Sequence, residues 1–369
     1  MILANLLILL IIAGCAVHRY FKSTLVRSFV TIINAVCAGT IAFGYFELIG
    51  NLVIKRETLV NWAQPLSFLL LFVLVFAILE TITFQLTRKP IDFGFLPECI
   101  GRIVGGIISG IIISGLLLTA LALTPLSGKF PYKRFDDRNP RIDKPQKVLL
   151  NTDGLVTGLF SIASGGSLSG ERSFTLIHPD FLDQVFLNRA NTKQVSILTV
   201  KKAIEVPKPA VWPAPDGLKD SRDPNNPIEP KSGHSLTIVR MGIKKLALKD
   251  AGKFTLSQLR VICRQKEDTG KAAAAKGINV YPIGYLKTKD QLQIKKLNEM
   301  IEITTKDFSR RENVKWLDFA FNLPNNYQPV LIEFKQNNIA ELPQPVSAEK
   351  APPPEPFEKK SKKKSTAKP

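Results

Sequence analysis

The sequence predicts an α+β fold in three parts: four membrane-spanning helices, short amphipathic helices, and a small β-sandwich exposed to water. Three observations predict it. Four long apolar runs lie within residues 1–125, two short segments with helical spacing lie within residues 126–200, and runs rich in branched and aromatic residues occupy residues 233–341. Only the first part has runs long enough to cross a bilayer, so we expect an integral membrane protein.

The apolar runs cover residues 2–17, 26–48, 63–86 and 103–123. Each is near the roughly 20 residues that a helix needs to cross about 30 Å of hydrocarbon. Residues 12–15 resemble a lipoprotein processing box, which would make the first run a cleaved signal peptide. Such a peptide has a basic start, whereas residues 1–5 carry no lysine or arginine, so we expect the first span to be retained.

Basic residues between the spans predict the orientation of this block. They gather in and beside the first and third connections: Arg19, Lys22, Arg27, Arg88, Lys89 and Arg102. The second connection has only Lys55 and Arg56. Because short cytoplasmic loops carry an excess of lysine and arginine, the first and third connections are predicted to be cytoplasmic. The termini and the extension then lie on the exoplasmic side of the membrane.

Small residues along the fourth span predict close helix packing. They lie about a helical turn apart in two adjacent stripes: Gly101, Gly105, Gly106, Gly110 and Ser114. In lipid no hydrophobic force draws helices together, so the close approach of small residues is a main source of association. The stripes could join copies of the chain into a homo-oligomer, or they could pack against the other spans of the same chain.

Glu80 in the third span and Asn34 in the second are the intramembrane polar candidates. A carboxylate inside lipid is costly and is by default a functional candidate. Glu80 could relay a proton or bind a cation in a small transporter or channel component. The alternatives are a structural ion pair with Arg27 or Arg102, at helix ends on the same predicted side, and snorkelling to the interface.

Residues 126–200 are predicted to form a juxtamembrane extension with two short helices. Residues 151–164 and 179–189 both carry apolar residues at helical spacing, and Pro179 suits the first position of the second helix. His178, directly before that helix, is predicted to cap or pack rather than to act in catalysis.

The remaining segments are distinguished by proline and by strand-like runs. Residues 201–232 contain seven prolines and predict an extended linker or a long irregular excursion. Residues 233–341 contain five runs rich in Val, Ile, Tyr, Trp and Phe, which predict a β-sandwich, with residues 291–301 as a helical insertion. Residues 342–369 are rich in proline and lysine and predict a disordered tail.

Residue spacing predicts no catalytic, metal or cofactor site. No serine in residues 164–170 has the G-x-S-x-G surroundings of a nucleophile elbow, and no cysteine or histidine lies near Cys263 in sequence to share a zinc ion. The formal net charge of +19 favours contacts between the lysine-rich tail and anionic surfaces. Nucleic-acid binding is not expected, because the tail lacks a folded basic surface with interleaved aromatic residues.

The start of the fourth span carries a likeness to a known family. An arginine followed by glycines at helical spacing, in a block of four spans with a basic first connection, resembles the colicin V production protein (CvpA) family; here these are Arg102, Gly105, Gly106 and Gly110. The family often has an aspartate just before the arginine and a glycine-phenylalanine pair in the first connection. This chain has Gly101 and Tyr20-Phe21-Lys22 at those places.

A second segment extends the resemblance over roughly residues 1–190. Residues 165–170 followed by residues 177–182 are similar to a segment of long CvpA-like proteins with an extra-membrane extension. The resemblance implies an inner-membrane protein linked to toxin production or export and to envelope maintenance, with no established catalytic residues. The β domain is loosely similar to exported immunoglobulin-like domains.

These observations favour a non-enzymatic membrane scaffold whose exoplasmic sandwich recruits an envelope or secreted protein of unknown identity. A transporter or channel component that uses Glu80 is the alternative.

Overall fold

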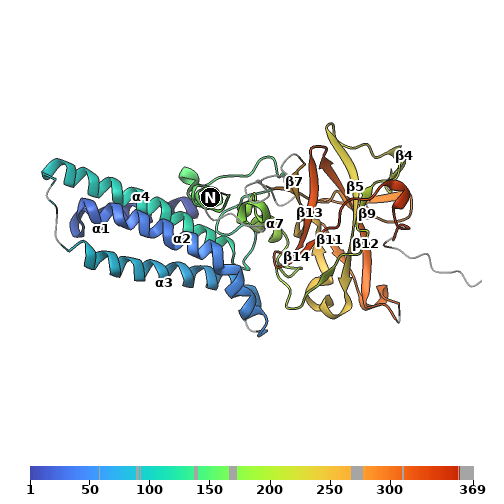
Figure 1. Cartoon of the computed structure of the whole chain (residues 1–369), viewed down its shortest axis with the longest axis horizontal. Helices are drawn as coiled ribbons and strands as arrows, with labels where there is room; N and C mark the ends of the chain where they lie inside the picture. Colours follow the sequence, from blue (N-terminus) through green and yellow to red (C-terminus); the bar gives the residue numbers. More distant parts are fainter. Residues whose placement is uncertain are drawn as a thin grey trace, which may run out of the picture.

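The computed structural model describes residues 1–57, 59–88, 91, 93–136, 140–165, 173–266, 277–309, 311–355 and 357. Four long helices project as a bundle from one side of a sheet-rich domain, and short helices lie between the two (Figure 1). The predicted α+β class is confirmed, because helices and strands occupy separate parts of the chain.

The four predicted spans are confirmed as helices that are long and apolar enough to cross a membrane. They are α1 (Ile2–Lys22), α2 (Leu25–Ile54), α3 (Ala63–Leu86) and α4 (Phe95–Ala122). Helix α3 has the predicted bounds, whereas the other three are longer than their apolar runs because backbone hydrogen bonding continues up to a capping residue. The Thr24 side chain accepts from the Arg27 amide at the start of α2, and Gly94, with φ +84°, precedes α4.

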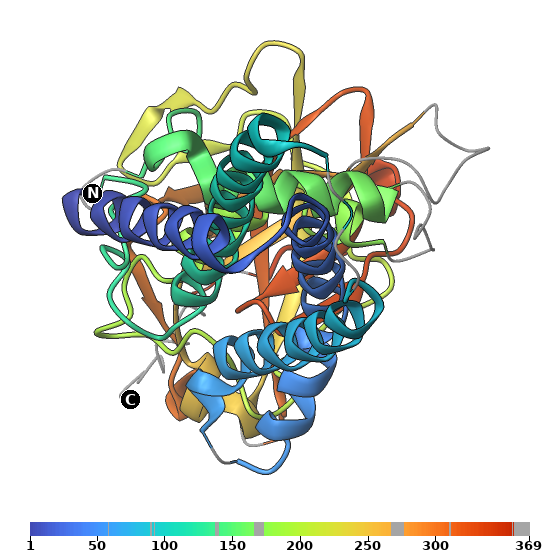
Figure 2. The ribbon, with the colours of Figure 1, turned by 90° about the vertical axis from the view of Figure 1, so that its left-hand side faces the viewer.

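Helix α2 packs against both α3 and α4, and α1 packs along α4. Figure 2 shows the four helices from the end of the bundle, in front of the sheet domain. Large apolar side chains on the outer faces of α1 and α3 are exposed, among them Leu9, Leu10, Leu70 and Ile78. An apolar outer surface of this kind suits contact with lipid rather than with water.

Both helices predicted in the extension are confirmed, and a third is added. They are α5 (Thr152–Gly165), α6 (Phe174–Ile177) and α7 (Phe181–Asn188). Rings of all three meet α2: Phe43 lies 4.8 Å from Phe160, 5.7 Å from Phe174 and 5.8 Å from Phe181 between centroids. The extension is therefore packed onto the bundle through an aromatic cluster. Residues 166–172 of the glycine-rich loop lie outside the described residues.

Fourteen strands make up the described sheets. They are β1 (Ile204–Glu205), β2 (Val211–Pro213), β3 (Lys219–Asp220), β4 (Asp223–Pro227), β5 (His234–Lys244), β6 (Lys253–Thr255), β7 (Leu259–Gln265), β8 (Ile278–Val280), β9 (Gly284–Leu286), β10 (Gln291–Ile294), β11 (Met300–Glu302), β12 (Val314–Pro324), β13 (Tyr327–Phe334) and β14 (Asn338–Glu341). One sheet has the order β1-β5-β12-β9-β10-β3-β4, with β2 also on β5. A second has the order β14-β13-β7-β8, and β11 pairs with β6. Among these pairs only β10 and β3 run parallel. The short helix α8 (Leu248–Ala251) follows β5.

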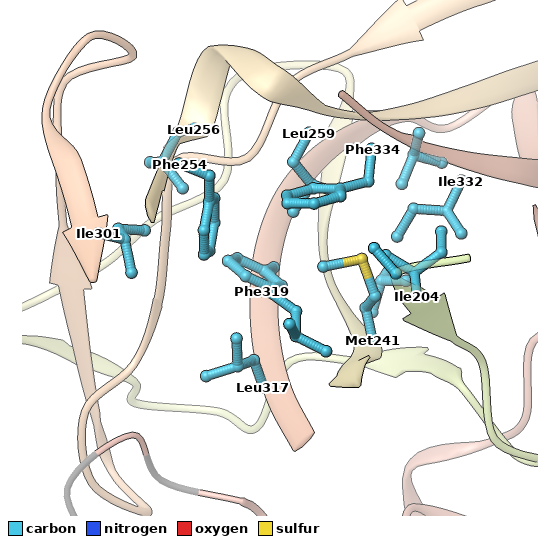
Figure 3. Packing of buried hydrophobic residues seen from close by; sticks show 14 of the residues in the cluster. Ile204, Met241, Phe254, Leu256, Leu259, Ile301, Leu317, Phe319, Ile332 and Phe334 are labelled. Carbon is cyan, nitrogen blue, oxygen red and sulfur yellow. The ribbon is translucent and has the colours of Figure 1, made fainter. Parts of the chain in front are cut away.

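The two larger sheets share one hydrophobic core (Figure 3). Strand β12 contributes Leu317, Phe319 and Phe321, which alternate along the strand, so they lie on one face of the sheet, and are at most 1% exposed. They meet Met241 of β5 and Phe334 of β13. Each large apolar side chain that is fully buried contributes about 1.5–3 kcal/mol to stability. Phe319 and Phe321 of this strand belong to the core, whereas Trp316 is half-buried and lies outside this cluster.

Two local predictions are corrected. Residues 201–232, predicted as a linker, instead contribute β1 to β4 to the larger sheet. Prolines are tolerated there because β4 is an edge strand and Pro213 ends β2, so few ladder hydrogen bonds are lost. Residues 291–301, predicted as a helix, form β10 and most of β11, because pairing with β9 and β6 outweighs local helix propensity.

The first part of the predicted tail lies against the sheet domain. The amide of Val346 donates to Val211 O at 3.0 Å, and the Arg240 guanidinium donates to Pro353 O at 2.6 Å. Phe357 stacks on Tyr285 with 5.0 Å between ring centroids. A backbone hydrogen bond, a guanidinium and a ring contact therefore hold a segment that has little apolar content of its own. The lysine-rich residues 358–369 lie outside the described residues.

Candidate functional site

Glu80 lies in a polar cluster where α1, α2 and α3 meet. Arg19 Nη2 of α1 is 3.0 Å from Glu80 Oε1, and Thr31 Oγ1 of α2 donates to the same oxygen at 2.5 Å. Glu80 therefore ties three helices together by a charge-assisted contact and a hydrogen bond. An interhelical ion pair was one of the alternatives that the sequence left open, but the partner is Arg19 and neither Arg27 nor Arg102.

The other two arginines have different partners. Arg27 donates to Thr87 O at 3.3 Å and lies 4.4 Å above the ring of Phe84. Arg102 pairs with Glu98 one turn earlier on α4, with 2.8 Å between Arg102 Nη2 and Glu98 Oε2. The sequence alone does not show which of the three arginines pairs with Glu80, because the turn from α1 into α2 determines which arginine faces α3.

Asn34 also forms a hydrogen bond between two helices. Its amide nitrogen donates to Thr83 Oγ1 of α3 at 2.8 Å, and the asparagine is 4% exposed. Both intramembrane polar candidates thus have partners on neighbouring helices, which is how polar groups are usually accommodated in lipid.

A cavity of about 400 Å³ lies beside Glu80, between the end of α1, the start of α2 and the end of α3. Three cations and one carboxylate line it, together with hydroxyl and aromatic side chains. The cations are Arg19, Lys22 and Arg27.

The small-residue stripes of α4 face other helices of the same chain. A Cβ on Gly105 would lie 2.7 Å from Ser28 Cβ of α2, and one on Gly106 would lie 2.6 Å from Ala16 Cα of α1. Gly101 faces Leu25 of α2 in the same way, and Gly110 faces Ile12 of α1. Ser114 is buried and donates to Ile111 O at 2.9 Å. The stripes are therefore already occupied within one chain, as the second of the two packing alternatives predicts.

The residues expected to set the orientation lie at matching helix ends. Arg19 and Lys22 are in the last turn of α1, Arg27 is in the first turn of α2, and Arg88 follows α3. These helix ends, with the start of α4 and Arg102, form the end of the bundle that points away from the sheet domain (Figure 1). Lys89 lies outside the described residues.

A second polar cluster, which the sequence reasoning missed, lies where the bundle meets the sheet domain. We call it the junction; it comprises Glu47 of α2, His178, Gln184 of α7, Arg260 of β7 and Glu333 of β13. His178 Nδ1 lies 2.8 Å from Gln184 Oε1, and its Nε2 lies 3.1 Å from Glu47 Oε1, close enough for an ion pair although the angles do not make a hydrogen bond. His178 therefore bridges a bundle helix and the extension.

Arg260 connects this histidine to the sheet domain. Its guanidinium donates to Glu333 Oε2 and, at 2.8 Å, to Ile177 O, and its Nη2 lies 3.3 Å from His178 Nδ1. Arg260, Glu333 and His178 are each at most 4% exposed. Two carboxylates, one guanidinium and one imidazole thus meet in a site built from four separate parts of the chain, in which only Glu47, with a side chain 32% exposed, reaches the surface.

The charges around His178 shift its pKa. Burial by itself lowers the pKa of the imidazole, but the facing carboxylate of Glu47, with a smaller contribution from Glu333, outweighs burial and the nearby Arg260. The net pKa is raised, so the junction favours the imidazolium form.

Arg189, at the end of α7, makes a further connection between the extension and the bundle. Its guanidinium donates to the carbonyl of Ala122, the last residue of α4, and to those of Leu126, Ser127 and Phe130, at 2.7–3.1 Å for the last three. A cation at the C-terminal end of a helix satisfies carbonyls that have no partner within the helix. Burial lowers the pKa of Arg189 to about 10.

One signal of the junction was present in the sequence. Glu47 lies within the predicted second span, 26–48, and is therefore an intramembrane carboxylate by the criterion that selected Glu80. Arg260 is a charge directly before the apolar run Val261–Cys263 of its strand. Neither position reveals its partner, because the partners are far apart in the sequence. Arg260 and Glu333 are separated by 73 residues, and Glu47 and His178 by 131.

Within the described ranges no group of three or more His, Cys, Asp or Glu side chains could hold a metal ion. In comparisons with protein-family models, curated proteins and solved structures, nothing matches this chain.

Proposed function

We propose that this chain is a non-enzymatic integral inner-membrane protein of the CvpA type. In this proposal the four helices anchor it in the bilayer, and the sheet domain, on the exoplasmic side, binds an envelope or secreted protein. The family resemblance supports an association with toxin production or export, or with envelope maintenance. The proposal includes an immunoglobulin-like character for the two packed sheets.

The observation that carries the proposal is the junction. Burying charges costs several kcal/mol for each ion and is tolerated only where partners are well placed. Here those partners come from α2, the extension and two strands, so they favour one orientation of the sheet domain relative to the bundle. A scaffold needs a fixed orientation of its binding domain, because every copy of the protein in the membrane then presents the same surface to the partner.

A cavity on the sheet domain is the best placed surface for a partner. It has a volume of about 440 Å³ and lies between residues 140–142 and strands β8, β10 and β12. Tyr281, Ile283 and Leu297 give it an apolar floor, and Lys231 and Lys296 lie exposed beside them. An apolar floor with a basic rim favours an extended partner segment that carries acidic residues.

Site-specific crosslinking tests this proposal in intact membranes. A photoreactive amino acid replaces Lys296, in the cavity, or Leu246, which is 59% exposed and outside the cavity. We expect a crosslinked product from position 296 and none from position 246. Absence of product at both positions would count against a partner-binding domain, and equal yields would count against this cavity.

Protease accessibility tests the orientation. We expect protease added to spheroplasts to cut the sheet domain, and protease added to inverted vesicles to leave it intact. The opposite pattern would place the domain in the cytoplasm and would change the class of partner.

The alternative is a transporter or channel component, and the cavity beside Glu80 is the observation that favours it. Glu80→Gln removes the charge, whereas Thr31→Val removes only the hydrogen bond to the carboxylate and serves as control. If Glu80 conducts a proton or a cation, flux is lost in Glu80→Gln and kept in Thr31→Val. Unchanged flux and phenotype in Glu80→Gln would eliminate this alternative.

A further inference from the structure

The cavity beside Glu80 carries more positive charge than the helices need for their own contacts. Arg19 is paired with Glu80, which leaves Lys22 and Arg27 as an excess of two positive charges. Lys22 is exposed, and none of the described residues is a partner for its ammonium group. Arg27 Nε is buried and has no acceptor among the residues described. Lys22 and Arg27 therefore line the cavity as cations without a carboxylate partner among the described residues.

The wall of the cavity is partly apolar and faces the outside of the bundle. Val30, Phe76 and Phe84 line it, and Phe84 is 51% exposed on the outer surface of α3. A ligand with a charged group in the cavity could therefore lay an apolar chain along the helices. The cavity also lies at the end of the bundle where three spans begin or end, which is the level of lipid headgroups if these helices cross a membrane.

We propose that this cavity binds the phosphate headgroup of an anionic phospholipid. The phosphodiester accepts a hydrogen bond from Lys22 and lies beside the guanidinium of Arg27, and one acyl chain lies against Phe84. Phosphate oxygens suit these donors because guanidinium and ammonium groups both form charge-assisted hydrogen bonds with them. Basic pockets between spans on the cytoplasmic side are a common form of headgroup site, and this end of the bundle carries the basic connections.

A simpler reading is that the cations only complement the C-terminal end of α1 and reach into bulk water. That reading accounts for Arg19 and Lys22, which are in the last turn of α1. It gives Arg27 one such contact, to Thr87 O after α3, but it leaves this arginine at the start of α2, where a positive charge is unfavourable for the helix dipole. A free anion would satisfy the same donors but would leave the apolar wall without a contact.

Native mass spectrometry of the full chain in detergent tests the site. The purified protein is mixed with dioleoyl phosphatidylglycerol or dioleoyl phosphatidylcholine, and bound lipid is counted. We expect retention of phosphatidylglycerol to exceed that of phosphatidylcholine, and to fall about fivefold in Lys22→Gln and in Arg27→Gln, which corresponds to about 1 kcal/mol for each charge near anionic lipid. Lys22 is exposed, so its substitution leaves the packing of the bundle unchanged.

Arg88→Gln is the matched control. It removes one positive charge from the same end of the bundle, but Arg88 does not line the cavity. We expect wild-type retention in this variant, and a loss equal to that in Lys22→Gln would show nonspecific attraction and overturn the proposal. Equal retention of both lipids would also overturn it. Displacement of phosphatidylglycerol by an equal concentration of inorganic phosphate would assign the cavity to a free anion instead.

Discussion

At the scale of single residues, the environment of a charged side chain decides what it does in this chain. Glu80 and Glu47 are both carboxylates on membrane helices, but Glu80 pairs with Arg19 inside the bundle and Glu47 faces His178 at its sheet-domain end. Arg189, which is 1% exposed, takes backbone carbonyls as its partners. A buried charge contributes to a unique structure only when such partners are complete.

His178 predicts a pH dependence of stability. Because its folded pKa is raised above the ordinary 6.5, its stabilisation is fully present below about pH 6.5 and is lost as the pH rises through the folded value. We expect the stabilisation from His178 to be lost as the pH rises above about 6.5, so that the thermal midpoints of the wild type and of His178→Gln, measured for the full chain in detergent, come closer together there. His234→Gln, in β5, is the control and should behave as wild type.

At the scale of elements, the contact between α1 and α4 depends on glycine. The nearest atoms to a Cβ on Gly106 belong to the backbone of α1, at 2.6 Å for Ala16 Cα and 3.0 Å for Cys15 O. Backbone atoms cannot turn aside as a side chain can, so the helices themselves would have to separate. Packing of this kind replaces the hydrophobic force that is missing between helices in lipid.

Gly106→Ala therefore measures this contact. We expect a loss of about 1–3 kcal/mol, the usual cost of overpacking a close contact. Gly14→Ala is the control, because a Cβ on Gly14 meets nothing within 4 Å and alanine favours the helix by about 0.5–1 kcal/mol. Reversible unfolding in mixed micelles compares the two variants. Equal stabilities would mean that α1 and α4 do not approach each other this closely.

At the scale of the whole molecule, the junction decides whether the bundle and the sheet domain behave as one unit. Arg260 is the charge that pairs with Glu333 and faces His178. Its loss would leave Glu333 buried without its guanidinium partner. Removing one partner of a buried pair costs about 3–5 kcal/mol, whereas an exposed pair is worth about 0–1 kcal/mol.

Arg260→Met should therefore release the sheet domain from the bundle. We expect limited proteolysis to cut residues 189–204, between α7 and β1, much faster than in the wild type. Lys253→Met breaks the exposed pair with Glu302 within the sheet domain and should leave the cleavage rate unchanged. Equal rates in the two variants would mean that other contacts hold the two parts together.

The sequence by itself determined the α+β class, the four spans, and the helices α5 and α7. These features depend on composition and periodicity within one segment, which burial in lipid or in a core selects directly. Only the tertiary structure decided that residues 201–232 join the larger sheet, that Arg19 is the partner of Glu80, and that Glu47 and Arg260 meet at His178. Strand pairing and ion pairing join groups far apart in the chain, so their partners are set by how the elements pack and not by any local pattern.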